Sequence, residues 1–189
     1  MKKELTSLVG SRSANRIMKA YPDAGNFLTA LRERTFPADD KAMMTLANAF
    51  TALEAVMLAG VLGKRELLNT PDAVRDFLRV HMAGRSQEIF TVLFLDNQNR
   101  LISADDMFFG SLAQTAVYPR AVVRKAMAYN SAAVVLAHNH PSSGLAEPSN
   151  ADKLLTDSLK SALAHLEVRV LDHLIVGDTI TSFAERGLL

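Results

Sequence analysis

The sequence predicts an α/β domain preceded by a helical region, and three observations lead to this prediction. Apolar residues recur at helical spacing through the first part of the chain. From Glu88 onward, β-branched and aromatic runs alternate with helical patterns, which is typical of a mixed α/β sheet. The composition, with 189 residues of which 49% are hydrophobic and 22% charged, is that of a globular chain. We expect a helical N-terminal region over 1–68 and a second domain over 69–189.

Residues 1–35 show short helical patterns that are interrupted at Gly10, Pro22 and Gly25. Basic side chains outnumber acidic ones in this segment. The basic residues are Lys2, Lys3, Arg12, Arg16, Lys19, Arg32 and Arg34. A basic patch of this kind can contact a phosphate backbone, but solvated helix faces have the same composition. DNA is therefore a candidate partner of this region. The net charge of the whole chain is only +1, which gives no general attraction to nucleic acid or to an anionic membrane.

A longer helix is expected from Pro37, because a proline followed by Asp39 and Asp40 suits a helix N-terminus. Its apolar residues repeat at three- and four-residue steps, and they are Met43, Leu46, Phe50, Leu53, Met57 and Val61. This stripe predicts a helix that faces the core or a partner, and a second copy of the chain, in a homodimer, is a candidate partner. Gly60 and Gly63 are expected to end the helix.

The second domain is expected to open with a helix and to continue as alternating strands and helices. Thr70 and Pro71 suit the N-cap and the first turn of the opening helix. Val74, Phe77 and Leu78 form its apolar face. Strands are expected over 88–95, 100–105, 131–138, 168–177 and 179–183, and helices over 119–130 and 149–166.

The residue types present exclude several classes of protein. The chain has no cysteine, so it has no disulfide, and any metal must be bound by nitrogen and oxygen atoms. The N-terminus is charged but lacks the apolar segment of a secretory signal peptide, and no run of about 18 apolar residues occurs. We therefore expect a cytoplasmic protein that does not enter the membrane.

Two histidines, His138 and His140, end an apolar strand. Side chains alternate along a strand, so the two imidazoles project to the same side and can bind one ion. Ser149 and Asp152 form a capping-box pattern, which places the Asp152 carboxylate in the first turn of the next helix. Two histidines and one aspartate make a three-ligand zinc site whose fourth tetrahedral position is left for water. We expect one zinc ion per chain.

Such a site also needs groups that move a proton and stabilise negative charge. Glu88 places a carboxylate at the start of a buried strand, and we expect it to act as general base. The Ser149 hydroxyl is expected to donate a hydrogen bond to the oxyanion. Each residue also has a plainer interpretation. Either histidine can be a surface or core residue, Asp152 can serve only as a helix cap, and Glu88 can simply precede a strand.

Other metal folds contain the same histidine pair, but in different surroundings. A cupin-type site has a Glu shortly after the pair and a further His, in an all-β chain, whereas the surroundings here are helical. Barrel amidohydrolases carry the pair near the N-terminus of a much longer chain. The histidines His81 and His165 show no partner pattern and are expected to be exposed.

The sequence resembles the RadC family of JAB/MPN-plus (JAMM) metallohydrolases over about residues 70–189. The matching segments are Glu88-x-Phe90, Leu95-Asp96, Pro119-Arg120, His138-Asn139-His140-Pro141-Ser142, Pro148-Ser149-x-x-Asp152, Leu171-Asp172-His173-x-Ile175 and Ser182-Phe183. The resemblance implies a three-layer α/β/α sandwich, the cytidine-deaminase-like JAB/MPN fold. The roles that it implies are zinc ligand for His138, His140 and Asp152, general base for Glu88, and oxyanion donor for Ser149.

Two features differ from the family pattern. Ser143 is an extra residue in the loop before Asp152, and we expect the loop to absorb it and the site to stay intact. Residues 1–68 lack the helix-hairpin-helix pattern with which family members often bind DNA. A further histidine of the matching segments, His173, can orient a metal ligand or support the sheet, and we expect structural support.

Three functions remain open at this point. The first is a zinc-dependent hydrolase of amide or isopeptide bonds that acts on a peptide or protein. The second is a DNA-repair or nucleic-acid-processing accessory protein, although phosphodiester cleavage commonly uses two metals about 4 Å apart and one three-ligand set is evident. The third is a binding module with a structural metal, which would need His173 or Glu88 as a fourth ligand.

Overall fold

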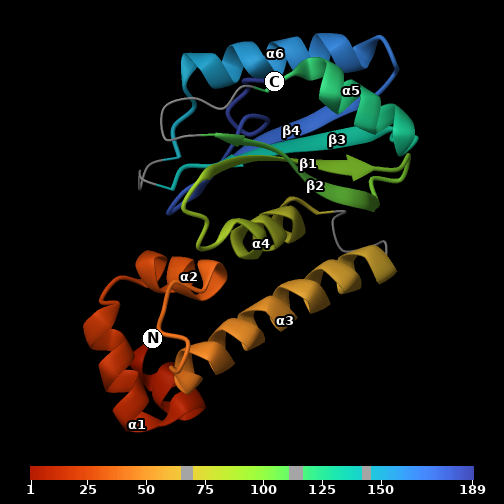
Figure 1. Cartoon of the computed structure of the whole chain (residues 1–189). Helices are drawn as coiled ribbons and strands as arrows, with labels where there is room; N and C mark the ends of the chain where they lie inside the picture. Colours follow the sequence, from red (N-terminus) through yellow and green to blue (C-terminus); the bar gives the residue numbers. More distant parts are fainter. Residues whose placement is uncertain (65–69, 111–116, 142–145) are drawn as a thin grey trace. The chain divides into compact units, whose positions relative to one another are not determined.

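The computed structural model describes residues 1–64, 70–110, 117–141 and 146–189, and of residues 57–64 it describes the backbone. Figure 1 shows the chain, which forms two compact units. The N-terminal unit comprises Met1–Val56 and Ala83–Ser86, and the C-terminal unit comprises Met57–Met82 and Gln87–Leu189. The expected domain boundary between residues 68 and 69 stays a prediction.

The N-terminal unit is helical, as the sequence predicts. Its helices are α1 (Lys2–Ala20), α2 (Ala24–Glu33) and the first part of α3 (Lys41–Lys64). Gly10 interrupts α1 with a φ of 78°, a conformation that glycine adopts at little steric cost. The buried core residues of this unit are Leu5, Ala14, Ile17, Phe27, Ala30, Leu31, Met43, Leu46 and Ala47.

Helix α3 begins later than the sequence predicts. Its first residue is Lys41 rather than Pro37. The Asp40 carboxylate accepts a hydrogen bond from the backbone N–H of Met43 at 3.1 Å and so caps the helix at this point. Burial raises the pKa of Asp40, but hydrogen bonds from Arg16 and Met43 outweigh burial and hold the pKa below its usual value.

The far end of α3 also differs from the prediction. The helix continues through Gly60 and Gly63 to Lys64. A glycine in a helix interior costs about 1 kcal/mol but keeps its backbone N–H, whereas a proline also removes a hydrogen bond. The two glycines therefore weaken the helix without ending it.

The apolar stripe of α3 is buried only in part. Met43 and Leu46 lie in the core of the N-terminal unit, whereas Leu53 is 52% exposed. The side chains of Met57 and Val61 lie outside the described residues. Packing of this stripe against a second copy of the chain stays a prediction.

The C-terminal unit is built on a five-stranded sheet. Its strands, in the order β2-β1-β3-β4-β5, are β1 (Glu88–Leu95), β2 (Leu101–Gly110), β3 (Ala133–Asn139), β4 (Arg169–Val176) and β5 (Ile180–Ser182). Neighbouring strands are antiparallel except β3 and β4, which run parallel. A parallel pair needs a crossover connection, and α6 (Asn150–Ala164) provides it. In the sequence, α6 is therefore the next helix or strand after β3.

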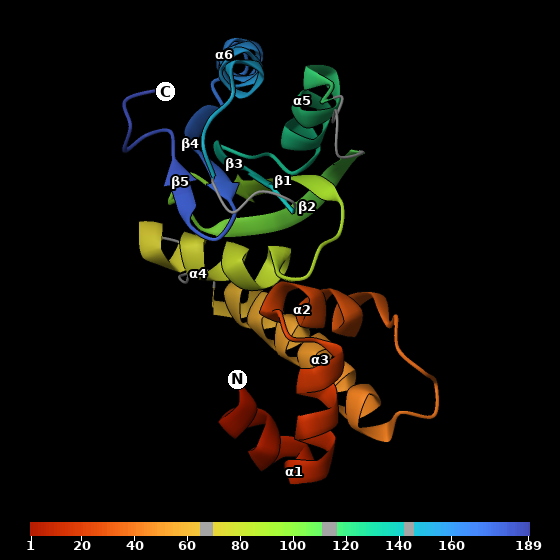
Figure 2. The same ribbon diagram turned by 90° about the vertical axis from the view of Figure 1, so that its left-hand side faces the viewer.

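Helices cover both faces of this sheet. Helix α4 (Pro71–Met82) lies against one face, and α5 (Pro119–Ala128) and α6 lie against the other (Figure 1, Figure 2). The apolar cluster on the α4 face includes Val74, Phe77, Leu78, Leu93, Val135 and Leu174. The cluster on the α5 and α6 face includes Phe90, Val92, Phe94, Val122, Leu136 and Leu159. The expected three-layer α/β/α arrangement is therefore confirmed.

The helices of the described ranges do not meet the requirements of a membrane span. None of them combines the length and the apolar character that crossing a bilayer requires.

The start of α4 is as predicted, because the Thr70 hydroxyl accepts a hydrogen bond from the backbone N–H of Ala73 at 3.3 Å.

Strand β2 is longer than the sequence predicts. Its expected range ends at residue 105, but it continues to Gly110, which pairs with Glu88 of β1. The sequence did not predict this continuation because it contains Asp105 and Asp106, and aspartate is depleted in strands. A carboxylate is tolerated in a half-buried strand only where it finds donors.

The two aspartates of β2 find donors on distant elements. Lys125 of α5 donates to Asp105 at 2.6 Å. Asp106 lies 2.7 Å from His81 of α4 and accepts a hydrogen bond of 2.7 Å from Thr91. The prediction that His81 is exposed is wrong, since its side chain is half-buried against this carboxylate. Local sequence could not show this pairing because the partners are 25 residues apart.

Candidate metal centre

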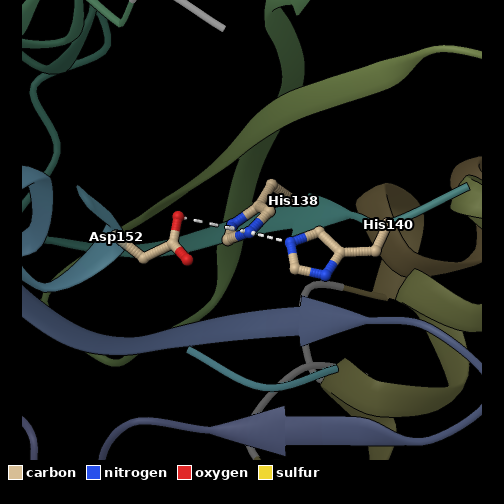
Figure 3. Close-up of side chains that lie close together, drawn as sticks. All are labelled: His138, His140 and Asp152. Atoms are coloured by element: carbon tan, nitrogen blue, oxygen red, sulfur yellow. Dashed lines mark hydrogen bonds and ion pairs between the residues drawn. The ribbon is translucent and has the colours of Figure 1, made fainter. Parts of the chain in front are cut away.

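The candidate metal ligands come from two adjoining segments of the C-terminal unit. His138 lies at the end of β3, His140 follows the strand, and Asp152 lies in the first turn of α6. Figure 3 shows His140 and Asp152 on either side of His138. One ligand atom from each residue lies within 4.8 Å of the other two, and within the described ranges this is the one such group of three found. The structure thus brings together the three side chains that the sequence singles out.

Two of the spacings between the candidate ligand atoms match those expected around a small tetrahedral ion. His138 Nε2 lies 3.1 Å from His140 Nε2 and 3.5 Å from Asp152 Oδ1. Zinc ligands lie about 2.1 Å from the ion, so two of them are about 3.4 Å apart in tetrahedral geometry. Two imidazole nitrogens and one carboxylate oxygen are also a donor set that zinc accepts without cysteine. These residues therefore form a candidate metal site.

The two carboxylate oxygens of Asp152 have separate partners. Oδ2 accepts hydrogen bonds from the backbone N–H of Ser149 at 2.8 Å and from its hydroxyl at 2.6 Å. The Ser149 hydroxyl accepts in turn from the Asp152 backbone N–H at 3.1 Å, which completes the predicted capping box. Oδ1 is the oxygen that lies near His138. Asp152 therefore caps its helix with one oxygen and presents the other to the histidines.

The protonation state of His138 suits metal binding. Burial lowers the pKa of His138 to about 4, and the lowering effect of His140 adds to burial while Asp152 opposes it. His138 is therefore neutral at pH 7, and its 3.5 Å contact with Asp152 is not an ion pair at that pH. A neutral imidazole is the form that binds a metal.

Glu88 lies on the same face of the sheet as His138. It begins β1 and is half-buried. Phe90, two residues further along, pairs with His138 across the strands, and the two rings stack with centroids 6.4 Å apart. Because alternate residues of a strand share a face, Glu88 is placed on the side of this pair that continues toward His140. Its carboxylate lies outside the group of three candidate ligands.

Asn139, between the two histidines, belongs to one of the segments that resemble the family, but the sequence indicated no role for it. It is buried, and its side-chain oxygen accepts a hydrogen bond from the backbone N–H of Ile89 at 2.7 Å. Its amide nitrogen donates to the backbone carbonyl of Gln87 at 3.1 Å. These bonds hold the backbone on both sides of Glu88. An amide side chain between two histidines, at the end of an apolar run, is the sequence signal that could have identified it.

His173 of β4 lies directly behind His138. Its Nε2 is 2.9 Å from His138 Nδ1, and its Nδ1 is 2.7 Å from the hydroxyl of Thr156 on α6. Burial lowers the pKa of His173 well below its usual value, and the neighbouring His138 lowers it further. The expectation of purely structural support for His173 is therefore incomplete, because the ring contacts a candidate ligand. Thr156 was not singled out from the sequence.

Ser149 and Ser143 belong to the segment between β3 and α6. Ser149 is exposed, and its hydroxyl proton is donated to Asp152 Oδ2 in this conformation. The inserted Ser143 lies outside the described residues. Its effect on the loop stays a prediction.

Comparison with known proteins identifies a family for this arrangement. The profile of the RadC-like JAB domain matches residues 68–188. The matched range contains the three candidate ligands as well as Glu88 and Ser149.

Individual relatives match the same part of the chain. The UPF0758 protein of Leptothrix cholodnii is 57% identical over 129 residues, which are 68% of this chain and 58% of that protein. The UPF0758 protein of a Polaromonas species is 58% identical over 133 residues, or 70% of this chain and 59% of that protein. That of Dechloromonas aromatica is 56% identical over 134 residues, with the same two shares. The chain therefore spans less than two thirds of the length of these relatives.

Proposed function

We propose, from the premise that the chain belongs to the family of RadC-like JAB domains, that it is a zinc-dependent hydrolase with its site in residues 69–189. The observation that carries this proposal is the convergence of His138, His140 and Asp152 within 4.8 Å. These three residues would hold the ion. Zinc, when bound, would supply a Lewis acid and lower the pKa of a water molecule.

The remaining chemistry is assigned to two residues of the chain. Glu88 would take a proton from the attacking water and deliver it to the leaving group. Its position on the face that carries the histidines, with its backbone held by Asn139, supports this role. Ser149 would turn its hydroxyl from Asp152 to the developing oxyanion, and its exposed position at the N-cap of α6 leaves room for that rotation.

This set of groups supports one substrate class in particular. A single metal and one carboxylate base suit attack on a carbonyl carbon, with the proton passed to a departing amine. We therefore assign amide or isopeptide bonds of a peptide or protein as the substrate.

An open site is favoured over a closed structural one. A closed site would need His173 or Glu88 as a fourth ligand. Both ring nitrogens of His173 already face partners, namely His138 and Thr156. Glu88 lies outside the clustered ligand atoms of the described residues. Three protein ligands leave the fourth position for water.

Nucleic-acid processing is the competing function, and it would draw on the basic N-terminal residues. Two of these are neutralised within the N-terminal unit. Arg16 bonds to Asp40 at 2.7 Å, and Arg32 bonds to Glu54 at 2.5 Å. This pairing reduces the positive charge available to a phosphate backbone, and DNA binding is left as the alternative to be tested.

Metal content tests the site directly. Elemental analysis of the purified protein should find about one zinc ion per chain. A His138→Ala, His140→Ala double variant should contain almost none. His165→Ala is the matched control, because His165 is an exposed histidine on the same unit and should leave the zinc content unchanged. Equal zinc in the wild type and the double variant would overturn the proposal.

A substrate screen then tests the reaction. Internally quenched peptides and isopeptide-linked conjugates should be cleaved by the zinc-loaded protein, whereas single-stranded and duplex DNA should remain intact. Cleavage of DNA in place of the peptides would establish the competing function. Loss of peptide cleavage in the double variant would link the activity to the site.

A further inference from the structure

A continuous chain of hydrogen bonds connects two of the proposed metal ligands behind the site. His138 Nδ1 lies 2.9 Å from His173 Nε2. His173 Nδ1 lies 2.7 Å from the Thr156 hydroxyl, which lies 2.6 Å from the backbone carbonyl oxygen of Asp152. The chain therefore runs from β3 through β4 to α6, where it ends on the residue that presents the carboxylate.

The direction in which hydrogen bonds are donated along this series follows from its last acceptor, the carbonyl oxygen of Asp152. A carbonyl oxygen can only accept a hydrogen bond, so Thr156 donates its single hydroxyl proton to the carbonyl of Asp152. Thr156 must then accept from His173, which places the proton of His173 on Nδ1 and leaves Nε2 as an acceptor. The acceptor Nε2 requires a donor, and that donor is Nδ1 of His138.

Burial determines whether the other ring nitrogen of His138, Nε2, carries a proton. His138 is 2% exposed and His173 is fully buried, and such surroundings disfavour a charged ring. A neutral imidazole carries one ring proton, so a His138 that donates through Nδ1 has a lone pair on Nε2. That lone pair faces His140 Nε2 and Asp152 Oδ1.

We propose that His173 and Thr156 are positioning residues that fix the tautomer of His138, so that its Nε2 lone pair points into the metal centre before an ion binds. This inference rests on the proposed zinc site and adds two residues that do not touch the ion. Groups that hold a ligand histidine in one tautomer and ring orientation raise the metal affinity of a site. Because Thr156 sits one turn after Asp152, the same bonds also tie α6 to the histidine strand.

If the hydrogen bonds were donated in the opposite direction, the protonation of His138 would be different. If Thr156 donated to His173, then His173 would carry its proton on Nε2 and donate to His138. His138 would then carry its own proton on Nε2, where it would block the ion. The short contact between Thr156 and the Asp152 carbonyl would also lack a proton. The two directions are therefore separable by experiment.

Zinc affinity of threonine variants is the first test. Thr156→Val keeps the shape of the side chain without its hydroxyl, and Thr156→Ser keeps the hydroxyl. Zinc affinity is measured on the full-length protein by competition with a chromogenic chelator. Thr156→Val should bind Zn²⁺ about 10- to 100-fold more weakly than wild type, whereas Thr156→Ser should bind it nearly as tightly as wild type. Circular dichroism of each variant checks that the chain is folded.

A matched control removes the general effect of losing a buried hydroxyl. Thr91 is as fully buried as Thr156, and its hydroxyl donates to Asp106, on the α4 face of the sheet. Thr91→Val makes the same chemical change away from the metal centre and should leave the zinc affinity unchanged. Equal affinity of the two Thr156 variants, or an equal loss in the Thr91 variant, would overturn the inference.

The ring tautomers in the metal-free protein are the second test. Long-range ¹H–¹⁵N correlation spectra distinguish the protonated from the unprotonated nitrogen of each histidine. In chelator-treated wild type, His138 and His173 should both be protonated on Nδ1, and Thr156→Val should lose this preference. A proton on Nε2 of wild-type His138 would overturn the inference. Absence of zinc binding in wild type would overturn the proposed function instead, and these spectra would still decide the direction of the chain.

Discussion

Two aspartate clusters lie over the same face of the sheet and differ in the groups that surround their half-buried carboxylates. In the Asp105 cluster (Ser103, Asp105, Lys125 and Tyr129), the carboxylate accepts hydrogen bonds from Lys125 at 2.6 Å and from Tyr129 at 3.0 Å. In the candidate metal centre, Asp152 Oδ1 faces the neutral ring of His138 at 3.5 Å. Both aspartate side chains are 16% exposed, so burial does not separate the two clusters.

The difference lies in the partners of each carboxylate. Burial raises the pKa of Asp105, but hydrogen bonds from Lys125, Ser103 and Tyr129 outweigh burial and hold the pKa below its usual value. The negative charge is thus compensated within the chain. In the metal centre the proposed tautomer directs a lone pair of His138 toward Asp152, and a cation would satisfy both. On this proposal, the two clusters differ in whether the compensating positive charge comes from the chain or from a bound cation.

The largest expected effect concerns turnover. Glu88→Gln should lower kcat by about 10²- to 10⁴-fold, because the amide cannot accept the proton of the attacking water. Its zinc content should equal that of wild type. Lys125→Met, in the Asp105 cluster, should leave kcat unchanged in the same assay. Hydrolysis by the Glu88 variant at the wild-type rate would exclude this carboxylate as the base.

The second largest expected effect is the loss of zinc affinity in Asp152→Asn. Because Asp152 Oδ2 accepts two hydrogen bonds from Ser149, the oxygen of an Asp152→Asn side chain should take that place. Its NH₂ group, which cannot bind a metal, would then face His138. We expect zinc affinity to fall on the order of 100-fold or more. Asp105→Asn is the control, and unchanged affinity in the Asp152 variant would show that this residue is not a ligand.

Added zinc should stabilise one cluster and not the other. Free zinc at ten times its Kd should raise the free energy of unfolding by about 1.4 kcal/mol, since only the folded chain presents the site. Urea denaturation with and without zinc measures the change. The increase should persist in Lys125→Met and disappear in the His138→Ala, His140→Ala variant. An increase in the double variant would place the zinc elsewhere.

The smallest expected effect is the pH dependence of the Asp105 cluster. The folded-state pKa of Asp105 is lowered, so its contribution to stability is present above the unfolded pKa of about 3.9 and is lost as pH falls through the lower folded value. Lys125→Met should therefore cost about 1 kcal/mol or less at pH 7. The difference from wild type should shrink as pH falls below about 4, as measured by urea denaturation. A difference that grows in acid would contradict this assignment.

Some elements follow the sequence closely because their signals are local. The apolar run after Glu88 predicts β1 with its observed bounds, Glu88–Leu95. Thr70 and Pro71 predict the start of α4. The capping box of Ser149 and Asp152 is also present as the spacing predicts. The two helix caps are made within a few residues. The strand is recognised from its local composition, although its hydrogen bonds go to β2 and β3.

Other elements could not be read from local patterns. The second half of β2 carries Asp105 and Asp106, whose donors on α5 and α4 come from distant parts of the chain. Helix α3 runs through Gly60 and Gly63, although glycine suggests an end. Propensity is a weak signal when packing or a long hydrogen-bond ladder opposes it.

The sequence by itself determined which side chains could form the metal centre, since strand alternation pairs His138 with His140 and the capping box places Asp152 in the first helical turn. Only the tertiary structure decided which oxygen of Asp152 faces the histidines, and that His173 and Thr156 stand behind them. The reason is physical. Periodicity acts over a few residues, whereas hydrogen-bond partnership depends on where the sheet brings together residues as far apart as His138 and His173, which are 35 positions apart in the chain.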